Sequence, residues 1–431
     1  MPATAPAAAS IATSGAAVPA LPARALASPG CSAATASGPR LGAAGATSIT
    51  TGGSPFGVAA TPDGRWAFDV SGGLGTAAPS VAVLRLDAVR GTAPALTRAG
   101  SVPLPASPSA AASLPAGAAV TPDGEYLLVA DGAGLVVISV ARAEAGAAGA
   151  VLGTLSVPGP AGRPGLADGA IEVAVSPDSR FAFVTLENDA EAAVFNLDAA
   201  VAHGLGHAGY VGAVPLGGGP VGMTVSPDGR WLYATSEDGL AAQHPAGLGA
   251  PGGCQGGVPG TGPGERPGTL TVVSLRRAES DPARSVTATV DAGYQPVRVV
   301  TAADGTQVWV TARASDDVLC FSAARLAADP ARALVAIARV GSEPVGLAAV
   351  RGGTLLVVAD SNRFAASGEN SGLSVVSVPA ALAGRPAVAG DLTTGSFPRD
   401  MAVSPDGTLL VSDYASGQVQ AVNTAALAAA G

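Results

Sequence analysis

The sequence predicts an all-β fold: a seven-bladed β-propeller of four-stranded blades, whose ring is closed by an N-terminal strand that joins the last blade. Three observations predict it. A Ser/Thr-Pro-Asp-Gly peptide recurs along the chain, its copies lie about one blade apart, and the last repeat lacks a strand that the N-terminal region can supply. An internal repeat overrides the two or three domains that 431 residues would otherwise suggest. We therefore expect a single propeller domain over residues 44–431.

Each copy of the repeated peptide has the residue types of a tight hairpin turn. Proline presets φ for a type I turn, aspartate suits the next position, and glycine takes the left-handed position that follows. Apolar residues alternate on both sides, as in Gly222–Val225 before one copy and Trp231–Ala234 after it. The turn aspartates are therefore interpreted as structural. Five copies are clear and two are degenerate, with turn positions at Asp63, Asp123, Asp178, Asp228, Asp304, Gly352 and Asp406.

The intervals between these turn positions run from 48 to 76 residues, which suits four-stranded blades. The hairpin supplies the first two strands of a blade. A fourth strand follows a short Ala/Arg-rich link, as in Val286–Val290. The third strands are expected at Ser80–Leu86, Leu135–Val140, Ala192–Leu197, Thr269–Leu275, Asp317–Ser322, Leu373–Val378 and Gln418–Asn423.

The two ends of the chain predict how the ring closes. The last repeat stops after its third strand, near Asn423. The segment Ala46–Thr51 resembles the entry to the last repeat, because Thr-Thr-Gly stands just ahead of a proline in both places. A strand from this segment would complete the last blade and leave no open edge there.

Composition excludes several function classes. All 23 basic residues are arginine, which excludes Schiff-base chemistry, a P-loop lysine and a lysine general base. The net charge of −9 and the lack of basic tracts argue against nucleic acid as a partner. No stretch has the length and apolarity of a transmembrane helix, so we expect no membrane span.

Two segments outside the repeats are rich in Ala, Gly and Pro, which indicates irregular structure. Residues 1–43 are expected to be a disordered Ala/Pro-rich tail, with a signal-peptide remnant as an alternative reading of their start. The Gly/Pro-rich insert 239–268 is either a lid over the channel or a surface loop. Cys320 lies in an apolar run and is expected to be a buried free thiol. Cys31 and Cys254 lie in these irregular segments and could form a disulfide in an exported protein.

The repeat unit resembles the YVTN or YncE-like β-propeller repeat, which is related to the lactonase-like propellers of the 6-phosphogluconolactonase type. The matching elements are Pro-x-Gly before the inner strand, Ser/Thr-Pro-Asp-Gly at the hairpin, and then an aromatic or aliphatic strand such as Leu232–Ser236 or Val308–Thr311. The resemblance covers about residues 44–425 and implies the fold. It implies little about activity, because this fold hosts many unrelated functions.

In propellers of this kind, the residue five positions before the hairpin proline lines the mouth of the central channel. Glycine holds this position in four repeats, where backbones crowd: Gly57, Gly117, Gly222 and Gly346. Charged residues hold it in the other three, namely Glu172, Arg298 and Asp400, and these form the candidate ligand-binding or catalytic cluster. Loops expected on the same face add Glu187, Asn188, Glu237, Asp238, Arg313, Asp316, Asp360, Asn362, Arg363, Arg399, Asp413 and Tyr414, and His244 of the insert could reach them.

The favoured function is an exported, monomeric, YncE-like binding or scaffold protein whose charged funnel receives a small molecule or a protein. The location would be extracellular or periplasmic, and otherwise cytoplasmic. A structural alternative is a funnel that is only ion-paired and solvated.

The enzymatic alternative is a lactonase-type hydrolase that acts on a small cyclic ester with Glu172, Arg298 and Asp400. Lactonase-like propeller enzymes use histidine, arginine and glutamate at the channel, whereas His203, His207 and His244 lie outside the inner strands. No base–nucleophile pair is recognisable, which favours binding over catalysis. We expect no cofactor; a calcium site at Glu172 and Asp400 is an alternative that Arg298 would oppose.

Overall fold

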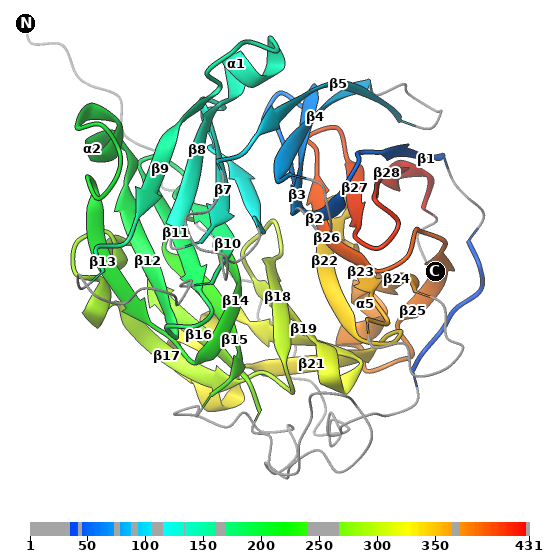
Figure 1. Cartoon of the computed structure of the whole chain (residues 1–431). Coiled ribbons are helices and arrows are strands. Elements are labelled where there is room, and N and C mark those ends of the chain that lie inside the picture. Colours follow the sequence, from blue (N-terminus) through cyan, green and yellow to red (C-terminus); the bar gives the residue numbers. More distant parts are fainter. Residues whose placement is uncertain are drawn as a thin grey trace, which may run out of the picture.

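The described part of the computed structural model consists of seven four-stranded antiparallel sheets arranged as blades around a central channel (Figure 1). The structure describes residues 35–41, 45–72, 78–87, 94–105, 115–132, 134–159, 169–239, 267–363 and 371–427. This architecture confirms the predicted seven-bladed propeller. His244, Cys31 and Cys254 lie outside the described residues, as does most of the Gly/Pro-rich insert.

Each blade runs from an inner strand at the channel to an outer strand at the rim. The first four blades are β2 (Ser54–Ala60), β3 (Trp66–Gly72), β4 (Ser80–Asp87), β5 (Ala95–Pro103); β6 (Ala118–Val120), β7 (Tyr126–Asp131), β8 (Gly134–Ser139), β9 (Val151–Ser156); β10 (Ala170–Val175), β11 (Phe181–Leu186), β12 (Glu191–Asn196), β13 (Tyr210–Pro215); and β14 (Gly218–Val225), β15 (Trp231–Asp238), β16 (Thr269–Ser274), β17 (Val286–Asp291). The last three are β18 (Pro296–Thr301), β19 (Gln307–Ala312), β20 (Asp317–Ser322), β21 (Leu334–Arg339); β22 (Pro344–Val350), β23 (Leu355–Asp360), β24 (Gly372–Ser377), β25 (Val388–Leu392); and β26 (Pro398–Val403), β27 (Thr408–Asp413), β28 (Gln418–Asn423), β1 (Ala46–Thr50).

The ring closes as the chain ends predict. Strand β1 pairs antiparallel with β28, from Ala46 opposite Val422 to Thr50 opposite Gln418. In Figure 1 the blue β1 lies beside the red β28. Ile49 packs against the core between the first and last blades. The N-terminal strand therefore joins the two ends of the chain in one blade.

The repeated hairpin turns are structural, as predicted. In the first copy, the Thr61 hydroxyl donates to Asp63 Oδ1 at 2.5 Å and the Arg65 amide donates to the same oxygen at 3.0 Å. Gly64 follows in the left-handed region, with φ of +70°. The same hydroxyl–carboxylate bond recurs at Asp123, Asp178, Asp228 and Asp406.

Short helices fill five of the links between third and fourth strands, which the sequence predicts only as short Ala/Arg-rich links. They are α1 (Val140–Glu144), α2 (Leu197–Ala202), α3 (Leu275–Ala278), α4 (Ala323–Ala328) and α5 (Val378–Leu382). Three begin at a side-chain cap, in which Asn196, Ser322 or Ser377 accepts a backbone amide of the first turn. Their alanines have high helix propensity and bury a small face against the blade.

The core lies between neighbouring blades. Its largest fully buried side chains include Trp309, Phe68 and Phe183, which stand on the second strands of their blades. Cys320 of β20 is buried and free, as predicted. None of the helices in the described ranges is long and apolar enough to cross a membrane.

Part of the expected N-terminal tail packs on the propeller. Residues 35–41 lie beside β25, where the Leu41 amide donates to the Asp391 carbonyl at 2.8 Å and the Asp391 amide donates to the Pro39 carbonyl at 3.0 Å. The Gly38 amide donates to the Asp391 carboxylate at 2.9 Å. This stretch therefore extends the outer edge of the sixth blade.

The inner strands approach one another so closely that glycine is required at the channel. A Cβ added to Gly222 would lie 2.1 Å from the Val297 carbonyl oxygen of the next blade. The corresponding distances are 2.5 Å at Gly57 and Gly117 and 2.8 Å at Gly346, each to a carbonyl oxygen of the following blade. Glycine therefore occupies these positions because the backbones crowd there, as the sequence predicts.

We predict that Gly222→Ala lowers the free energy of unfolding by about 1–3 kcal/mol, because the new methyl group overpacks the channel wall. The matched control is Gly100→Ala in β5, where an added Cβ meets nothing within 4 Å. Urea unfolding of both variants measures the difference. Equal stabilities would contradict a sterically required glycine at the channel.

Candidate functional site

The three charged channel residues meet, although they come from three different blades. Arg298 of β18 donates through Nη1 to Glu172 Oε2 of β10 and through Nη2 to Asp400 Oδ1 of β26 at 2.8 Å. The side chains of Glu172, Arg298 and Asp400 are only 10–13% exposed. The Val58 amide of the first blade donates to Asp400 Oδ2 at 3.0 Å. The cluster predicted from the repeat position therefore exists, and it ties four blades together across the channel.

A β-bulge at the start of each of these inner strands aims the side chains inward. Registers shift between Ala170 and Val173 in β10, between Pro296 and Val299 in β18, and between Pro398 and Asp400 in β26. A bulge frees a backbone amide from the hydrogen bonds of the sheet. Hydroxyl groups of the second strands accept hydrogen bonds from these freed amides. The pairs are Glu172 with Thr185, Gly222 with Thr235, Arg298 with Thr311 and Asp400 with Ser412, at 2.9–3.0 Å.

The same hydroxyls also link neighbouring blades. The Thr235 hydroxyl donates to the Val297 carbonyl at 2.7 Å, and the Thr311 hydroxyl donates to the Val345 carbonyl at 3.0 Å. Ser412 reaches the Phe56 carbonyl at 3.2 Å, across the junction between the last and first blades. The backbone that carries the charged channel residues is thus held by hydrogen bonds to hydroxyls of the second strands, and not by loops.

Burial and neighbouring charge set the protonation of the cluster. Burial raises the pKa of Glu172 to about 8; the Arg298 charge opposes this rise and the Asp400 charge adds to it. For Arg298, burial disfavours the charge, but Asp400 and Glu172 outweigh it and raise the pKa. Arg298 is therefore a permanently charged cation held by two carboxyl groups.

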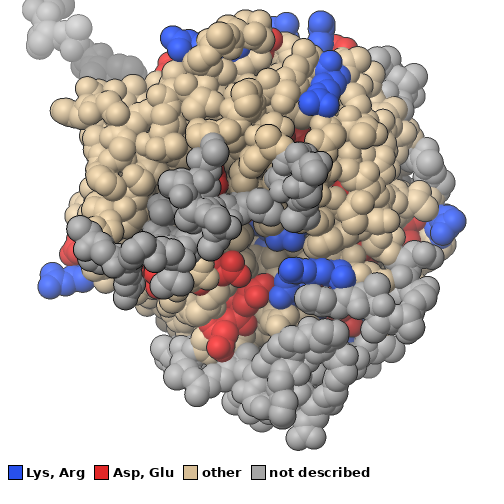
Figure 2. Space-filling model, in the orientation of Figure 1, with Lys and Arg blue, Asp and Glu red and all other residues tan. Residues whose placement is uncertain are grey.

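A cavity of about 220 Å³ opens above this cluster, and we call it the funnel. Arg298 lines its floor, while Glu172 and Asp400 do not line it. Aliphatic side chains surround the floor, because an apolar residue precedes four of the channel positions: Ile171, Val221, Val297 and Val345. The charged lining consists of Arg298, Arg313, Arg363, Arg399, Glu187 and Glu237, and Figure 2 shows basic and acidic side chains gathered near the centre of this face.

The funnel arginines differ in their partners. Arg313 Nη2 pairs with Glu237 at 3.0 Å and donates to Gln295 Oε1 at 2.9 Å. Arg399 instead stacks on Phe56, with its guanidinium carbon 3.5 Å from the ring centroid. Among the described residues, no acidic side chain pairs with Arg399. Burial and the charges of Arg363 and Arg298 lower the pKa of Arg399.

Three aromatic rings support Arg399. Phe397 and Tyr414 lie with their centroids 5.5 and 5.7 Å from its guanidinium carbon, and they contact each other at 5.2 Å. Of this group, Tyr414 was predicted from the sequence. Phe56 and Phe397 were missed; their signal was an aromatic residue directly beside the proline that enters an inner strand, as in Pro55-Phe56 and Phe397-Pro398.

Two of the predicted site residues point away from the funnel. Asp360 and Asp413 are the last residues of their second strands and are buried, at 6% and 0% exposure. Ser374 donates to Asp360 at 2.6 Å, and Thr394 donates to Asp413 at 2.6 Å. Side chains alternate along a strand, so a residue next to a channel-facing one such as Ser412 faces the opposite side.

The residues present do not favour a calcium site. Arg298 occupies the space between Glu172 and Asp400 and already neutralises charge there. Within the described ranges, no group of three or more His, Cys, Asp or Glu side chains is placed to hold a metal ion.

Comparison with known proteins supports the fold and does not identify a family. No protein-family model and no curated protein sequence matches this chain. A hydrazine synthase chain from Kuenenia stuttgartiensis is 16% identical, with a TM-score of 0.59 over 90% of this chain and 97% of that one. A chain of a mitotic checkpoint complex is 11% identical, with a TM-score of 0.59 over 90% and 93%.

A third solved structure is the periplasmic gluconolactonase of Pseudomonas aeruginosa. It is 20% identical, with a TM-score of 0.55 over 84% of this chain and 88% of that one. At these identities the likeness concerns the fold alone, and the three names describe unrelated activities. The fold and the site together define a seven-bladed β-propeller with an ion-paired channel beneath a charged funnel.

We predict that Arg298→Met lowers the free energy of unfolding by about 3–5 kcal/mol, because it leaves two buried carboxyl groups without their cation. The triple variant Arg298→Met, Glu172→Gln, Asp400→Asn replaces all three ionisable side chains and should recover most of this loss. Chemical denaturation measures both. A single variant as stable as the wild type would show that the cluster does not hold the blades together.

Asp413 makes stability depend on pH. Burial raises the pKa of its carboxyl from 3.8 to about 6. Between pH 3.8 and about 6, Asp413 holds a proton in the folded chain that it has lost in the unfolded chain. The free energy of unfolding therefore falls as pH rises through this window, by up to about 1.4 kcal/mol per pH unit. We predict a shallower pH profile for Asp413→Asn in this window. The exposed Asp87→Asn control should keep the wild-type profile, and an unchanged profile in Asp413→Asn would contradict the assignment.

Proposed function

We propose that this protein is a non-enzymatic β-propeller that binds a small anionic ligand in its funnel. The observation that carries the proposal is Arg399, a guanidinium stacked on Phe56 with no acidic partner among the described residues. A stacked arginine is held in place in advance, so little conformational entropy is lost when it binds a carboxylate or phosphate.

The electrostatics of the funnel favour an anion. Four arginines and two glutamates line it, so the lining carries an excess of positive charge when all these groups are ionised. Arg399 lies in the field of Arg363, Arg298 and Arg313, and this mutual repulsion disfavours its charged form. An anion bound beside Arg399 would offset that repulsion and would make strong charge-assisted hydrogen bonds.

The shape and lining of the funnel restrict the ligand further. A volume of about 220 Å³ suits a molecule of on the order of ten non-hydrogen atoms. The aliphatic side chains around the floor and the Phe56 and Phe397 rings offer apolar contact. The best match is a small organic acid with a short carbon skeleton.

The second candidate function is a lactonase-type hydrolase. Two observations favour it: Glu172 has a pKa in the range useful for general acid–base catalysis, and a gluconolactonase shares the fold. The positions of the two carboxyl groups weigh against it. Both are engaged by Arg298 and neither lines the funnel, so neither has direct access to a substrate placed there.

The proposal includes a YncE-like propeller that is exported and acts as a monomer. The Ser/Thr-Pro-Asp-Gly hairpins support the family assignment. The periplasmic location in the name of one structural neighbour supports export. Closure of the ring by β1 supports a monomer, because the last blade needs no strand from a second chain.

We predict that succinate or inorganic phosphate binds the wild-type protein and that Arg399→Gln weakens this binding about 10- to 100-fold, since a hydrogen bond to a charged group contributes about 1.5–3 kcal/mol. Calorimetric titration at low ionic strength is the measurement. The matched control is Arg142→Gln, because Arg142 is exposed on the second blade, where its side chain donates to the Gly149 carbonyl. Failure of both anions to bind, or equal affinity in Arg399→Gln, would reject the proposal.

A parallel assay separates binding from catalysis. Hydrolysis of D-glucono-1,5-lactone above the spontaneous rate, lost in Glu172→Gln and Asp400→Asn but kept in Arg399→Gln, would support the hydrolase instead. Folding of each variant is checked by its thermal transition.

A further inference from the structure

A second, larger cavity lies beside the sixth blade, and its lining residue Ser396 directly precedes Phe397 of the funnel lining. Its volume is about 730 Å³, and we call it the outer cavity. It is bounded by residues 35–41 on one side and by β24, β25 and the segment that leads into β26 on the other. None of its lining residues lines the funnel.

The wall formed by residues 35–41 is closely fitted to the blade. An added Cβ on Gly38 would lie 2.6 Å from the Gly390 Cα, and one on Gly390 would lie 2.5 Å from Leu41. The Ala36 amide donates to the Val340 carbonyl at 2.8 Å. Tight backbone contact and hydrogen bonds at both ends of this segment make the cavity part of the folded structure.

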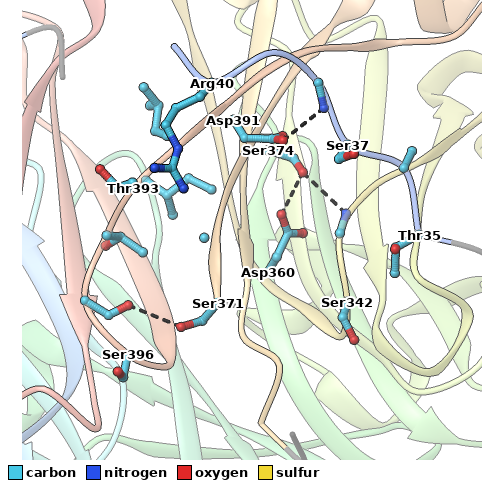
Figure 3. Close-up of a pocket in the computed structure, with 18 of the residues that line it drawn as sticks. Thr35, Ser37, Arg40, Ser342, Asp360, Ser371, Ser374, Asp391, Thr393 and Ser396 are labelled. Atoms are coloured by element: carbon cyan, nitrogen blue, oxygen red, sulfur yellow. Dashed lines mark hydrogen bonds between the residues drawn. The ribbon is translucent and has the colours of Figure 1, made fainter. Parts of the chain in front are cut away.

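The lining is dominated by hydroxyl groups. Figure 3 shows Thr35 and Ser37 on one wall and Ser371, Ser374 and Thr393 on others, around a common open space. Among all its lining residues, only Ala36, Leu373 and Leu392 have an aliphatic side chain. A surface of this kind offers many groups that both donate and accept hydrogen bonds, and it offers little to an apolar ligand.

Two carboxyl groups and one arginine complete the lining. Asp391 accepts a hydrogen bond from the Gly38 amide, and Arg40 lies at the exposed rim, where Figure 3 shows it on the same side as Thr393. Asp360 is only 6% exposed; one of its oxygens accepts from Ser374 and the other has no hydrogen-bond partner among the described residues. Burial raises the pKa of Asp360 well above its ordinary value, which favours the protonated form, and a protonated carboxyl group can donate a hydrogen bond as well as accept one.

We propose that the outer cavity binds a small polyhydroxylated molecule, a sugar or a sugar alcohol. Vicinal hydroxyl groups match a wall of serine and threonine hydroxyls, and carboxyl and guanidinium groups each bind two neighbouring hydroxyls at once.

Other ligand classes fit less well. A single cation would leave most of the volume unfilled and would be repelled by Arg40. An organic anion would meet two carboxyl groups and one arginine. A neutral ligand with many hydroxyl groups is repelled neither by Arg40 nor by the two carboxyl groups, and it can fill the volume.

The test is saturation-transfer difference NMR on the full chain with D-sorbitol and D-glucose at millimolar concentration. We expect saturation transfer to the carbon-bound protons of at least one probe, with an affinity about fivefold to tenfold lower in Thr393→Val and in Ser371→Ala, because each removes one hydrogen-bonding group. The matched control for Thr393→Val is Thr97→Val, at an exposed threonine of β5 in the first blade.

A wall variant gives an independent readout. Gly38→Val should displace residues 35–41 from β25 and abolish the saturation transfer, while the thermal transition of the propeller remains. Arg399→Gln should leave sugar binding unchanged, so failure of the funnel proposal and failure of this one are distinguishable.

Two results would overturn the proposal. One is the absence of saturation transfer from both probes, or transfer that Thr393→Val, Ser371→Ala and Gly38→Val all leave unchanged. The other is a rise in the thermal transition with Ca²⁺ but with neither sugar, lost in Asp391→Asn, which would make the outer cavity a cation site.

Discussion

The close approach of the inner strands around the channel is the constraint on which the rest of the structure depends. At Gly222 a carbonyl oxygen of the next blade occupies the space that a side chain would need. Bulges then free backbone amides, and hydroxyls such as those of Thr235 and Thr311 bind these amides and reach the next blade. The ring is thus held by short polar contacts at its centre and by apolar packing between blades farther out.

This constraint explains why the charged channel residues act mainly as structure. Space at the channel is scarce, so Arg298 meets Glu172 and Asp400 directly and water has little room between them. Burying such ion pairs in a low-dielectric environment costs desolvation free energy, and in return the pairs specify how the blades contact one another. Arg399 lies outside this ion-paired cluster and rests on aromatic rings instead of a carboxylate.

Much of the fold could be predicted because its signals are local. The turn at Asp63 and the missing last strand supplied by Ala46–Thr50 are both visible in the chain order. Counting from the hairpin proline also identified Arg298 and its two partners, since every blade repeats the same geometry. The aromatic support of Arg399 and the direction of Asp413 could not be predicted, because they depend on contacts between segments far apart in sequence and on which side of a strand faces inward.

By itself, the sequence determined the blade number, the hairpin turns, the closure of the ring and the one channel position in each blade that holds Glu172, Arg298 or Asp400 or a glycine, because each follows from a repeated local pattern. Only the tertiary structure decided which charges neutralise one another. It pairs Arg298 and Arg313 with carboxylates, leaves Arg399 on Phe56, and packs residues 35–41 onto β25 to enclose the outer cavity. Charge pairing and cavity formation depend on distances across blades, and a linear pattern contains no information on those distances.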